Sequence, residues 1–244
     1  MKMTGDMNAL TKRFEKLILA LIPIPTSLAV LTSLWAVFLW VPTERNLGIV
    51  QRIFYYHVPS ALACYVGFII AALASIAYLA RGKQVYDHLA RAGVEVGMLF
   101  ASMVLITGPL WAKPSWGTYW TWDARLTTMF VLWLVYFAYL LLRAFSRDDE
   151  MGKRFAAVLA IIGTLDIPLI VLATRLWQGA HPAVLQSTKA DSGLKDPAMG
   201  ITLGICMLAF ALLFTWLWTL RFSVLRMTEA VEELEYRNDE ALAS

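Results

Sequence analysis

Charged side chains are scarce in this sequence of 244 residues, of which they make up only 16%. Hydrophobic residues make up 59%, and the mean hydropathy of +0.61 is too high for an ordinary soluble domain. The net charge of +3 is small and spread along the chain, so it indicates no nucleic-acid partner. The composition therefore predicts a membrane protein in which residues 1–244 form a single membrane domain.

Two chemical motifs are also absent from the sequence. No glycine-rich loop is followed by Lys and Ser or Thr, so we expect no nucleotide hydrolysis and assign no catalytic residue. No C-x-x-C-H sequence is present, which excludes covalent attachment of a c-type haem to this chain. The two cysteines, Cys64 and Cys206, lie inside apolar runs, and we interpret them as packing residues rather than a disulfide. A binding protein is therefore expected rather than an enzyme.

Six apolar runs are long enough to cross a bilayer, whose hydrocarbon core requires about 20 helical residues. They predict an all-α integral membrane protein, a bundle of about six transmembrane helices. The first run is interpreted as a retained anchor, because no small-residue cleavage site follows it. The predicted spans are 17–41, 59–80, 94–111, 126–145, 155–177 and 199–222. Residues 223–244 are predicted to form a tail, whose charged part after Arg226 is a short surface helix.

A cluster of aromatic residues occupies the connection between the third and fourth predicted spans. Residues 111–125 read W-A-K-P-S-W-G-T-Y-W-T-W-D-A-R and hold four Trp, together with a Pro and a Gly that shape the connection. Trp and Tyr gather at membrane interfaces in any case, but that tendency explains one or two rings at a helix end rather than four. We therefore predict a loop or shallow segment that offers a flat aromatic surface to a large planar ligand.

Lys and Arg residues divide unevenly between the two predicted sides of the membrane. Fourteen of the 21 lie in the termini and in the connections after the second and fourth spans, and seven lie in the other three connections. Because cytoplasmic loops are enriched in Lys and Arg, both termini are predicted to be cytoplasmic. The Trp-rich connection is then predicted to face outward.

Only three histidines are present, and two of them share the predicted outer face. His57 precedes the second span and His181 follows the fifth, each beside a proline, whereas His88 falls on the cytoplasmic side. A single interfacial histidine is usually just solvated, but neutral imidazole is also a good iron ligand. Two imidazoles would complete the coordination of a porphyrin iron, while the indoles pack against the ring and Lys113 and Arg125 meet its propionates. The combination predicts an external site for non-covalent haem b with His57 and His181 as axial ligands.

Residues 116–123, W-G-T-Y-W-T-W-D, match the W-G-x-x-W-x-W-D signature of the haem-handling membrane proteins of cytochrome c maturation. In length, number of spans and one outer histidine on each side of the signature, the sequence most resembles the haem exporter protein C (CcmC) family. The resemblance runs from about residue 52 to residue 181. Tyr119 stands where many members have Trp, and it keeps an aromatic ring at that position.

The resemblance implies a multi-pass protein of the bacterial cytoplasmic (inner) membrane that presents haem at the outer face and delivers it to the periplasmic haem chaperone CcmE. It also implies a membrane complex with the transporter subunits CcmA and CcmB and the small protein CcmD. His57 and His181 correspond to the family's axial ligands. The residues assigned to haem binding are Trp111, Trp116, Gly117, Tyr119, Trp120, Trp122, Asp123 and Arg125.

The main alternative function is a b-type cytochrome anchor that passes electrons between a quinone and a partner. Haems that carry electrons in membrane bundles are usually held by ligands inside helices. The predicted position of both histidines in connections beside proline therefore favours delivery over electron transfer.

Three acidic residues have more than one interpretation. Asp166 falls near the middle of the fifth span and could be functional, protonated, or a cap for a kink at Pro168. Glu95 is expected to be solvated at the inner end of the third span. Asp123 could pair with Arg125, although a surface salt bridge contributes little to stability.

Overall fold

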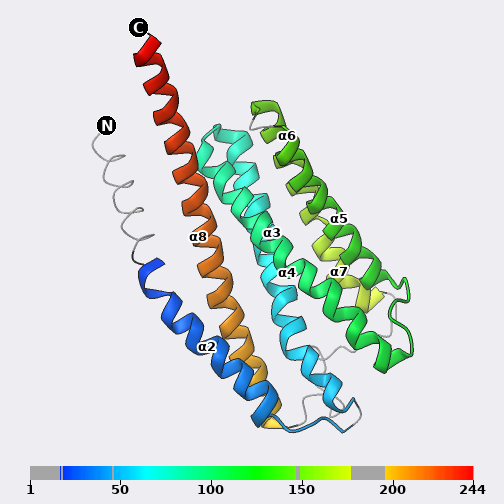
Figure 1. Cartoon of the computed structure of the whole chain (residues 1–244). Helices are drawn as coiled ribbons and strands as arrows, with labels where there is room; N and C mark the ends of the chain where they lie inside the picture. The colour runs from blue at the N-terminus through cyan, green and yellow to red at the C-terminus, as the bar shows by residue number, and fades with distance from the viewer. Residues whose placement is uncertain (1–16, 18, 46, 147–148, 177–195, 244) are drawn as a thin grey trace.

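The computed structural model describes residues 17, 19–45, 47–146, 149–176 and 196–243. Those residues form helices joined by short connections, and they contain no β-strand, only one isolated antiparallel bridge between Glu44 and Gly48. The helices pack side by side as an elongated bundle (Figure 1). The predicted all-α class is confirmed.

Seven α-helices and two short helical segments make up the described chain. They are α2 (Pro23–Trp35), the π-helical η1 (Ala36–Trp40), the 3₁₀ segment η2 (Ile49–Ile53), α3 (Phe54–Arg81), α4 (Gln84–Trp116), α5 (Ala124–Phe145), α6 (Glu150–Thr164), α7 (Asp166–Leu176) and α8 (Pro197–Ala243). Five stretches are long and apolar enough to cross a membrane: Pro23–Trp40, Ile49–Arg81, Gln84–Trp116, Ala124–Phe145 and Pro197–Leu242. Each of them overlaps one predicted span.

The fifth predicted span, 155–177, is wrong as a continuous helix. The chain breaks at Leu165 into α6, of 15 residues, and α7, which begins at Asp166 and has 11 described residues. Pro168 explains the break, because it lacks the N–H that would bond to the carbonyl of Thr164. The backbone tightens instead, with the Leu165 N–H donating to Ile162 O at 3.1 Å. Asp166 therefore begins α7 rather than lying within a long helix.

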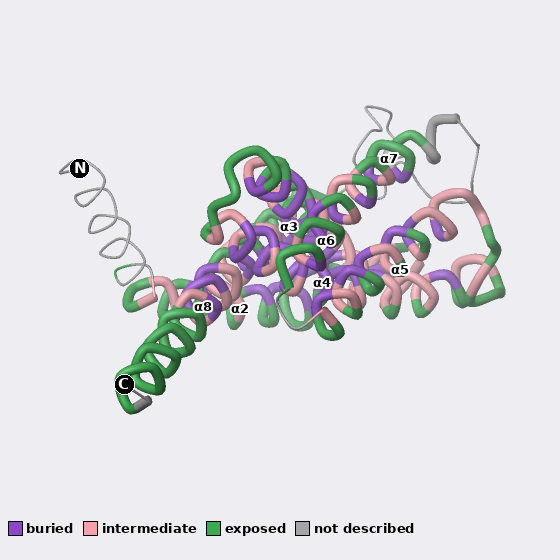
Figure 2. Tube along the Cα trace, turned by 90° about the horizontal axis from the view of Figure 1, so that it is seen from above, coloured by how far each residue is buried: buried purple, intermediate pink, exposed green. Residues whose placement is uncertain are grey.

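Helix α8 is longer than predicted at its C-terminal end. It is one helix of 47 residues, about 70 Å long, so it is roughly twice as long as the hydrocarbon core is thick. The tail is helical and exposed as predicted, but it continues α8 without a break, because no Gly or Pro lies between 205 and 243 to end the helix. Residues 227–242 of this extension are exposed, as the green C-terminal part of α8 shows in the view from above (Figure 2).

Helices α3 and α4 form a tight antiparallel hairpin at the centre of the bundle. Only Gly82 and Lys83 separate them, and Gly82 takes the left-handed conformation, φ +64°, that ends α3. The two backbones approach closely at Gly67 and Gly93. An ideal Cβ on Gly67 would lie 2.8 Å from the Gly93 carbonyl oxygen, so these positions exclude any side chain.

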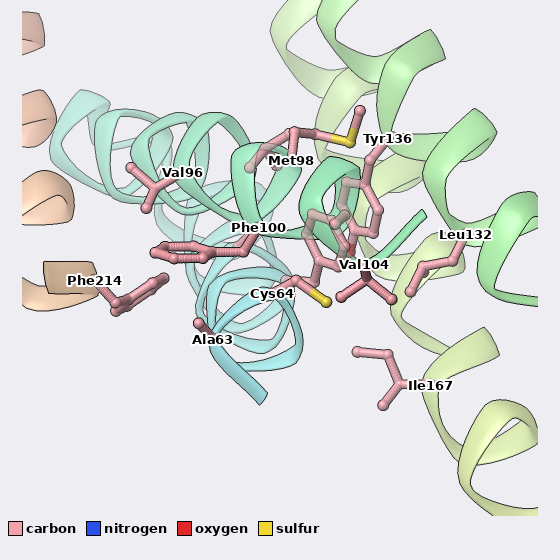
Figure 3. Close-up of a cluster of buried hydrophobic side chains, with 14 of the residues drawn as sticks. Ala63, Cys64, Val96, Met98, Phe100, Val104, Leu132, Tyr136, Ile167 and Phe214 are labelled. Atoms are coloured by element: carbon pink, nitrogen blue, oxygen red, sulfur yellow. The ribbon is translucent and has the colours of Figure 1, made fainter. Parts of the chain in front are cut away.

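Apolar side chains from the hairpin and its neighbours fill the core (Figure 3). The Phe68 ring of α3 stacks on Tyr136 of α5, with centroids 3.7 Å apart. Phe100 of α4 meets Phe214 of α8 at 6.2 Å. The two cysteines are buried and free, as expected. The hairpin therefore holds α5 and α8 in place on either side of it.

The end of the bundle where α4 begins carries the paired charges. Arg143 of α5 forms a two-pronged ion pair with Asp87 of α4, at 2.9 and 3.2 Å, and both side chains are under 5% exposed. Glu95 is not simply solvated as predicted, because it bonds Arg91 on its own helix and Arg221 on α8. These pairs tie α4 to its neighbours at the end opposite the Trp-rich segment.

Candidate functional site

His57 is the fourth residue of α3, not part of the connection before it as predicted. The helix begins at Phe54, so Pro59 is its sixth residue rather than part of its first turn. The imidazole Nδ1 lies 2.8 Å from the Thr107 hydroxyl of α4. The prediction that both candidate ligands lie in connections is therefore wrong for His57.

The Trp-rich segment is partly helical. Helix α4 continues through Trp111 and Pro114 to Trp116, and Gly117 ends it in the left-handed conformation at φ +80°. The loop proper is 117–123. Lys113 stabilises the turn, since its Nζ donates to Gly117 O at 2.9 Å and lies 5.3 Å from the centre of the Tyr119 ring.

The four indoles do not form the flat surface that the sequence suggested. Trp111 and Trp116 meet edge to face, at 5.3 Å and 89°, and Trp120 and Trp122 do the same at 5.5 Å and 79°. Phe130 of α5 meets Trp120 in the same way at 6.1 Å. Edge-to-face contact is the arrangement that aromatic quadrupoles favour, so the rings form a shaped cluster instead of a plane.

Trp122 has a strained backbone within this cluster. Its φ of +53° is the only positive value at a non-glycine among the described residues. The left-handed region costs a residue with a Cβ roughly 1–2 kcal/mol, so the surrounding loop must hold it there. The Trp122 side chain is 70% exposed, and that of Tyr119 in the same loop is 56% exposed. These two rings are the accessible part of the cluster.

Asp123 is the N-cap of α5. Its Oδ1 accepts hydrogen bonds from the backbone N–H groups of Arg125 and Leu126, both at 3.0 Å, and its Oδ2 accepts one from the Thr121 hydroxyl at 2.7 Å. The alternative of an ion pair with Arg125 is not realised, because the contact runs through the Arg125 backbone. The Arg125 guanidinium forms no ion pair within the described part of the chain.

Two buried indole N–H groups in the cluster have no acceptor in the part of the chain that the structure describes. Trp111 Nε1 and Trp120 Nε1 are shielded from solvent and bond to no described residue. Buried donors normally find a partner, so an unsatisfied pair needs an explanation. Together with the cations of Lys113 and Arg125, they provide donors for an anionic ligand that also offers a large apolar surface. Haem, a planar macrocycle with two carboxylates, fits this set of donors and rings.

The structure brings His57 and the Trp-rich segment together. Thr107, which His57 contacts, lies four residues before Trp111 and therefore on the same face of α4, about 6 Å along the axis. His88 lies near the other end of α4, roughly 35 Å from Trp111 by helix rise, with its Nε2 3.7 Å from Glu229. His57 and His88 therefore lie near opposite ends of the α3–α4 hairpin, and their placement on opposite sides of the membrane stays a prediction.

His181 and the rest of 177–195 lie outside the described residues, so its pairing with His57 stays a prediction. Among the described residues, no group of three or more His, Cys, Asp and Glu side chains could hold a metal ion. Haem iron takes four nitrogens from its porphyrin and requires only axial ligands from a protein.

Sequence reasoning missed one residue at this site, Thr107, and the structural role of another, Asp123. Thr107 was not identified, because which α4 side chain faces His57 depends on how the two helices pack. The capping role of Asp123 was visible in principle, since an Asp directly before an apolar helical run is an N-cap signal. Asp166 stays open, because it begins α7 and its buried Oδ2 bonds to no described residue.

Comparisons with known proteins agree on one group of relatives. A family model described as "CcmC: Heme exporter protein C" matches residues 5–237. The chain is 33% identical over 176 residues to a "Heme exporter protein C" of Bradyrhizobium diazoefficiens, covering 72% of this chain and 66% of that protein. It is 32% identical over 196 residues to the protein of the same description in Escherichia coli K12, covering 80% and 78%. A "Putative cytochrome c biosynthesis ccmC-like mitochondrial protein" of Marchantia polymorpha is 30% identical over 169 residues, covering 69% and 70%.

Proposed function

The chain belongs to the haem exporter protein C (CcmC) family, and from this premise we propose that it binds haem at the Trp-rich end of its bundle and delivers it to the periplasmic haem chaperone CcmE. Family membership supports a role in cytochrome c maturation for this multi-pass membrane protein. The observation that carries the proposal is the pair of buried indole N–H groups of Trp111 and Trp120, which have no acceptor among the described residues. Trp111 lies one helical turn from Thr107, the residue that His57 contacts.

We assign the haem contacts by chemistry. His57 offers a neutral imidazole nitrogen to the iron, and His181 is proposed as the second axial ligand. The Trp rings contact the macrocycle, with the exposed Trp122 at its edge. Trp111 and Trp120 donate their N–H groups to the propionates, and Arg125 neutralises their charge. Haem is the cargo of this site, so each contact must be strong enough to hold it and weak enough to release it.

His57 lies within a helix, so its position does not distinguish haem delivery from electron transfer. Two other features favour delivery. The site lies at one end of the bundle, with Tyr119 and Trp122 exposed, where a partner protein can reach the haem. The family's description as a haem exporter supports the same choice.

We further propose the inner membrane as the location, with both termini cytoplasmic and the haem site on the periplasmic side. The grouping of charges supports this orientation, since Arg81, Arg143 and Arg221 lie at the end of the bundle opposite the Trp-rich loop. CcmA, CcmB and CcmD are the proposed partners in the membrane.

A transfer experiment tests the function. Full-length protein loaded with haem would be mixed with haem-free CcmE, and haem followed by absorbance after the two proteins are separated. Arg125→Gln should weaken haem binding, whereas the control Arg226→Gln, at the other end of the bundle, should not. Haem that stays on this protein while CcmE remains empty would contradict delivery and favour a permanently bound cytochrome haem.

A further inference from the structure

Thr107 lies where α4 meets the first turns of α3, and its side chain contacts His57 across that interface. The hydroxyl oxygen Oγ1 is 2.8 Å from the imidazole Nδ1. The two residues are 50 positions apart in sequence, so the contact depends on the packing of the α3–α4 hairpin. It is therefore a tertiary contact that could orient the ring.

A second contact fixes the direction of this hydrogen bond. Thr107 Oγ1 lies 2.6 Å from the carbonyl oxygen of Met103, one turn earlier in α4. A carbonyl only accepts, so the hydrogen between these two oxygens belongs to the Thr107 hydroxyl. Because a hydroxyl has only one hydrogen, Oγ1 must use a lone pair to accept the Nδ1–H of His57. The neutral ring then carries its hydrogen on Nδ1 and its lone pair on Nε2.

Gly108 lies next to Thr107 on α4 and faces the same ring. An ideal Cβ at Gly108 would lie 3.6 Å from Cε1 of His57, an ordinary van der Waals distance, so the absent side chain leaves a small space beside the imidazole. The two ring nitrogens point in divergent directions within the ring plane. With Nδ1 held against Thr107, the Nε2 lone pair is directed away from Thr107.

We propose that Thr107 is a positioning residue whose hydroxyl sets the tautomer and orientation of His57 so that Nε2 binds haem iron. The inference rests on the proposed function in one respect, namely that His57 is an iron ligand. Histidines that bind metals almost always donate their other ring N–H to an acceptor, and loss of that acceptor weakens metal binding by about 10- to 100-fold. Thr107 supplies the acceptor here.

The first test requires no haem. ¹⁵N NMR of histidine-labelled, full-length protein in lipid nanodiscs distinguishes protonated from unprotonated ring nitrogens, and His57→Gln assigns the His57 signals by their loss. At a pH where His57 is neutral, the wild type should show Nδ1 protonated. Thr107→Val keeps the branched shape without the hydroxyl and should give a mixture of tautomers, whereas Thr107→Ser should retain the wild-type pattern.

The second test measures haem directly by titration with ferric haem. Thr107→Val should lower the affinity about 10-fold or more and shift the reduction potential of the bound haem, and Thr107→Ser should restore both. Thr128→Val is the matched control, since Thr128 donates the same kind of bond to Ala124 O, at 2.7 Å, in α5. In a His57→Ala background, Thr107→Val should cause no further change, because it acts only through His57.

The two tests separate failure of this inference from failure of the proposed function. An unchanged tautomer in Thr107→Val, or an equal loss of affinity with and without His57, overturns the positioning role alone. Wild-type affinity and spectrum in His57→Ala overturn His57 as a ligand, whatever the tautomer. The inference is supported by a tautomer change that accompanies a His57-dependent loss of affinity.

Discussion

Replacing Trp120 with Phe removes one donor from the cluster while keeping an aromatic ring in the same place. The indole N–H of Trp120 is buried and has no acceptor among the described residues, and its ring meets Trp122 and Phe130 edge to face. Phe can maintain both ring contacts but cannot donate a hydrogen bond. If the N–H bonds a haem propionate, its loss costs about 1.5–3 kcal/mol, which is roughly a 10- to 150-fold weaker affinity.

Haem titration monitored by absorbance measures this affinity. Repeating the titration with haem dimethyl ester, whose propionates carry no charge, should reduce the difference between wild type and Trp120→Phe. Trp120→Ala should lose far more than Trp120→Phe, because truncating a large aromatic costs about 3–5 kcal/mol. Trp133→Phe is the control, because its N–H already bonds Ser102 Oγ at 2.9 Å inside the bundle. Equal haem affinities for wild type and Trp120→Phe would refute the donor role.

Three further predictions concern the loop, the hairpin and the orientation. Asp123→Asn should preserve the α5 cap and haem binding, whereas Asp123→Ala should lower stability by about 0.5–2 kcal/mol in thermal unfolding; equal unfolding of the two variants would contradict the cap. Gly93→Ala should destabilise the protein by about 1–3 kcal/mol, since its Cβ would lie 2.7 Å from Gly67 O. The control Gly204→Ala has open space and should be neutral or better, and similar losses in both would exclude close helix approach as the cause. Thr118→Cys should react with a membrane-impermeant thiol reagent added from the periplasmic side, and reaction only from the cytoplasmic side would contradict the proposed orientation.

Long apolar runs were enough to predict the helical class, because burial in lipid requires every backbone group to bond within its helix. They could not show where helices end inside polar segments. The third span was predicted to end at residue 111, with Trp116 in a loop or shallow segment, yet α4 continues to Trp116 and stops at Gly117. The fifth predicted span is apolar on both sides of Leu165, so its sequence shows no boundary there. The helix nevertheless divides at Leu165, because Pro168 has no backbone N–H to donate.

The candidate site was predictable in composition but not in geometry. Residue types identified the Trp-rich segment and His57, since few side chains suit a haem. Which residues these side chains contact depends on how the helices pack, as the contact between Thr107 of α4 and His57 of α3 shows. The strained backbone of Trp122 and the edge-to-face indole pairs likewise arise from the loop's own fold.

The absorption spectrum of ferric haem bound to the full-length protein tests the central claim most directly. With His57 and His181 both bound to the iron, the haem should be six-coordinate and low-spin. His57→Ala and His181→Ala should each open one axial position and change the spectrum, and added imidazole should partly restore it. His88→Ala, at the opposite end of α4, should leave it unchanged. A wild-type spectrum in either His57→Ala or His181→Ala would contradict the paired-ligand account.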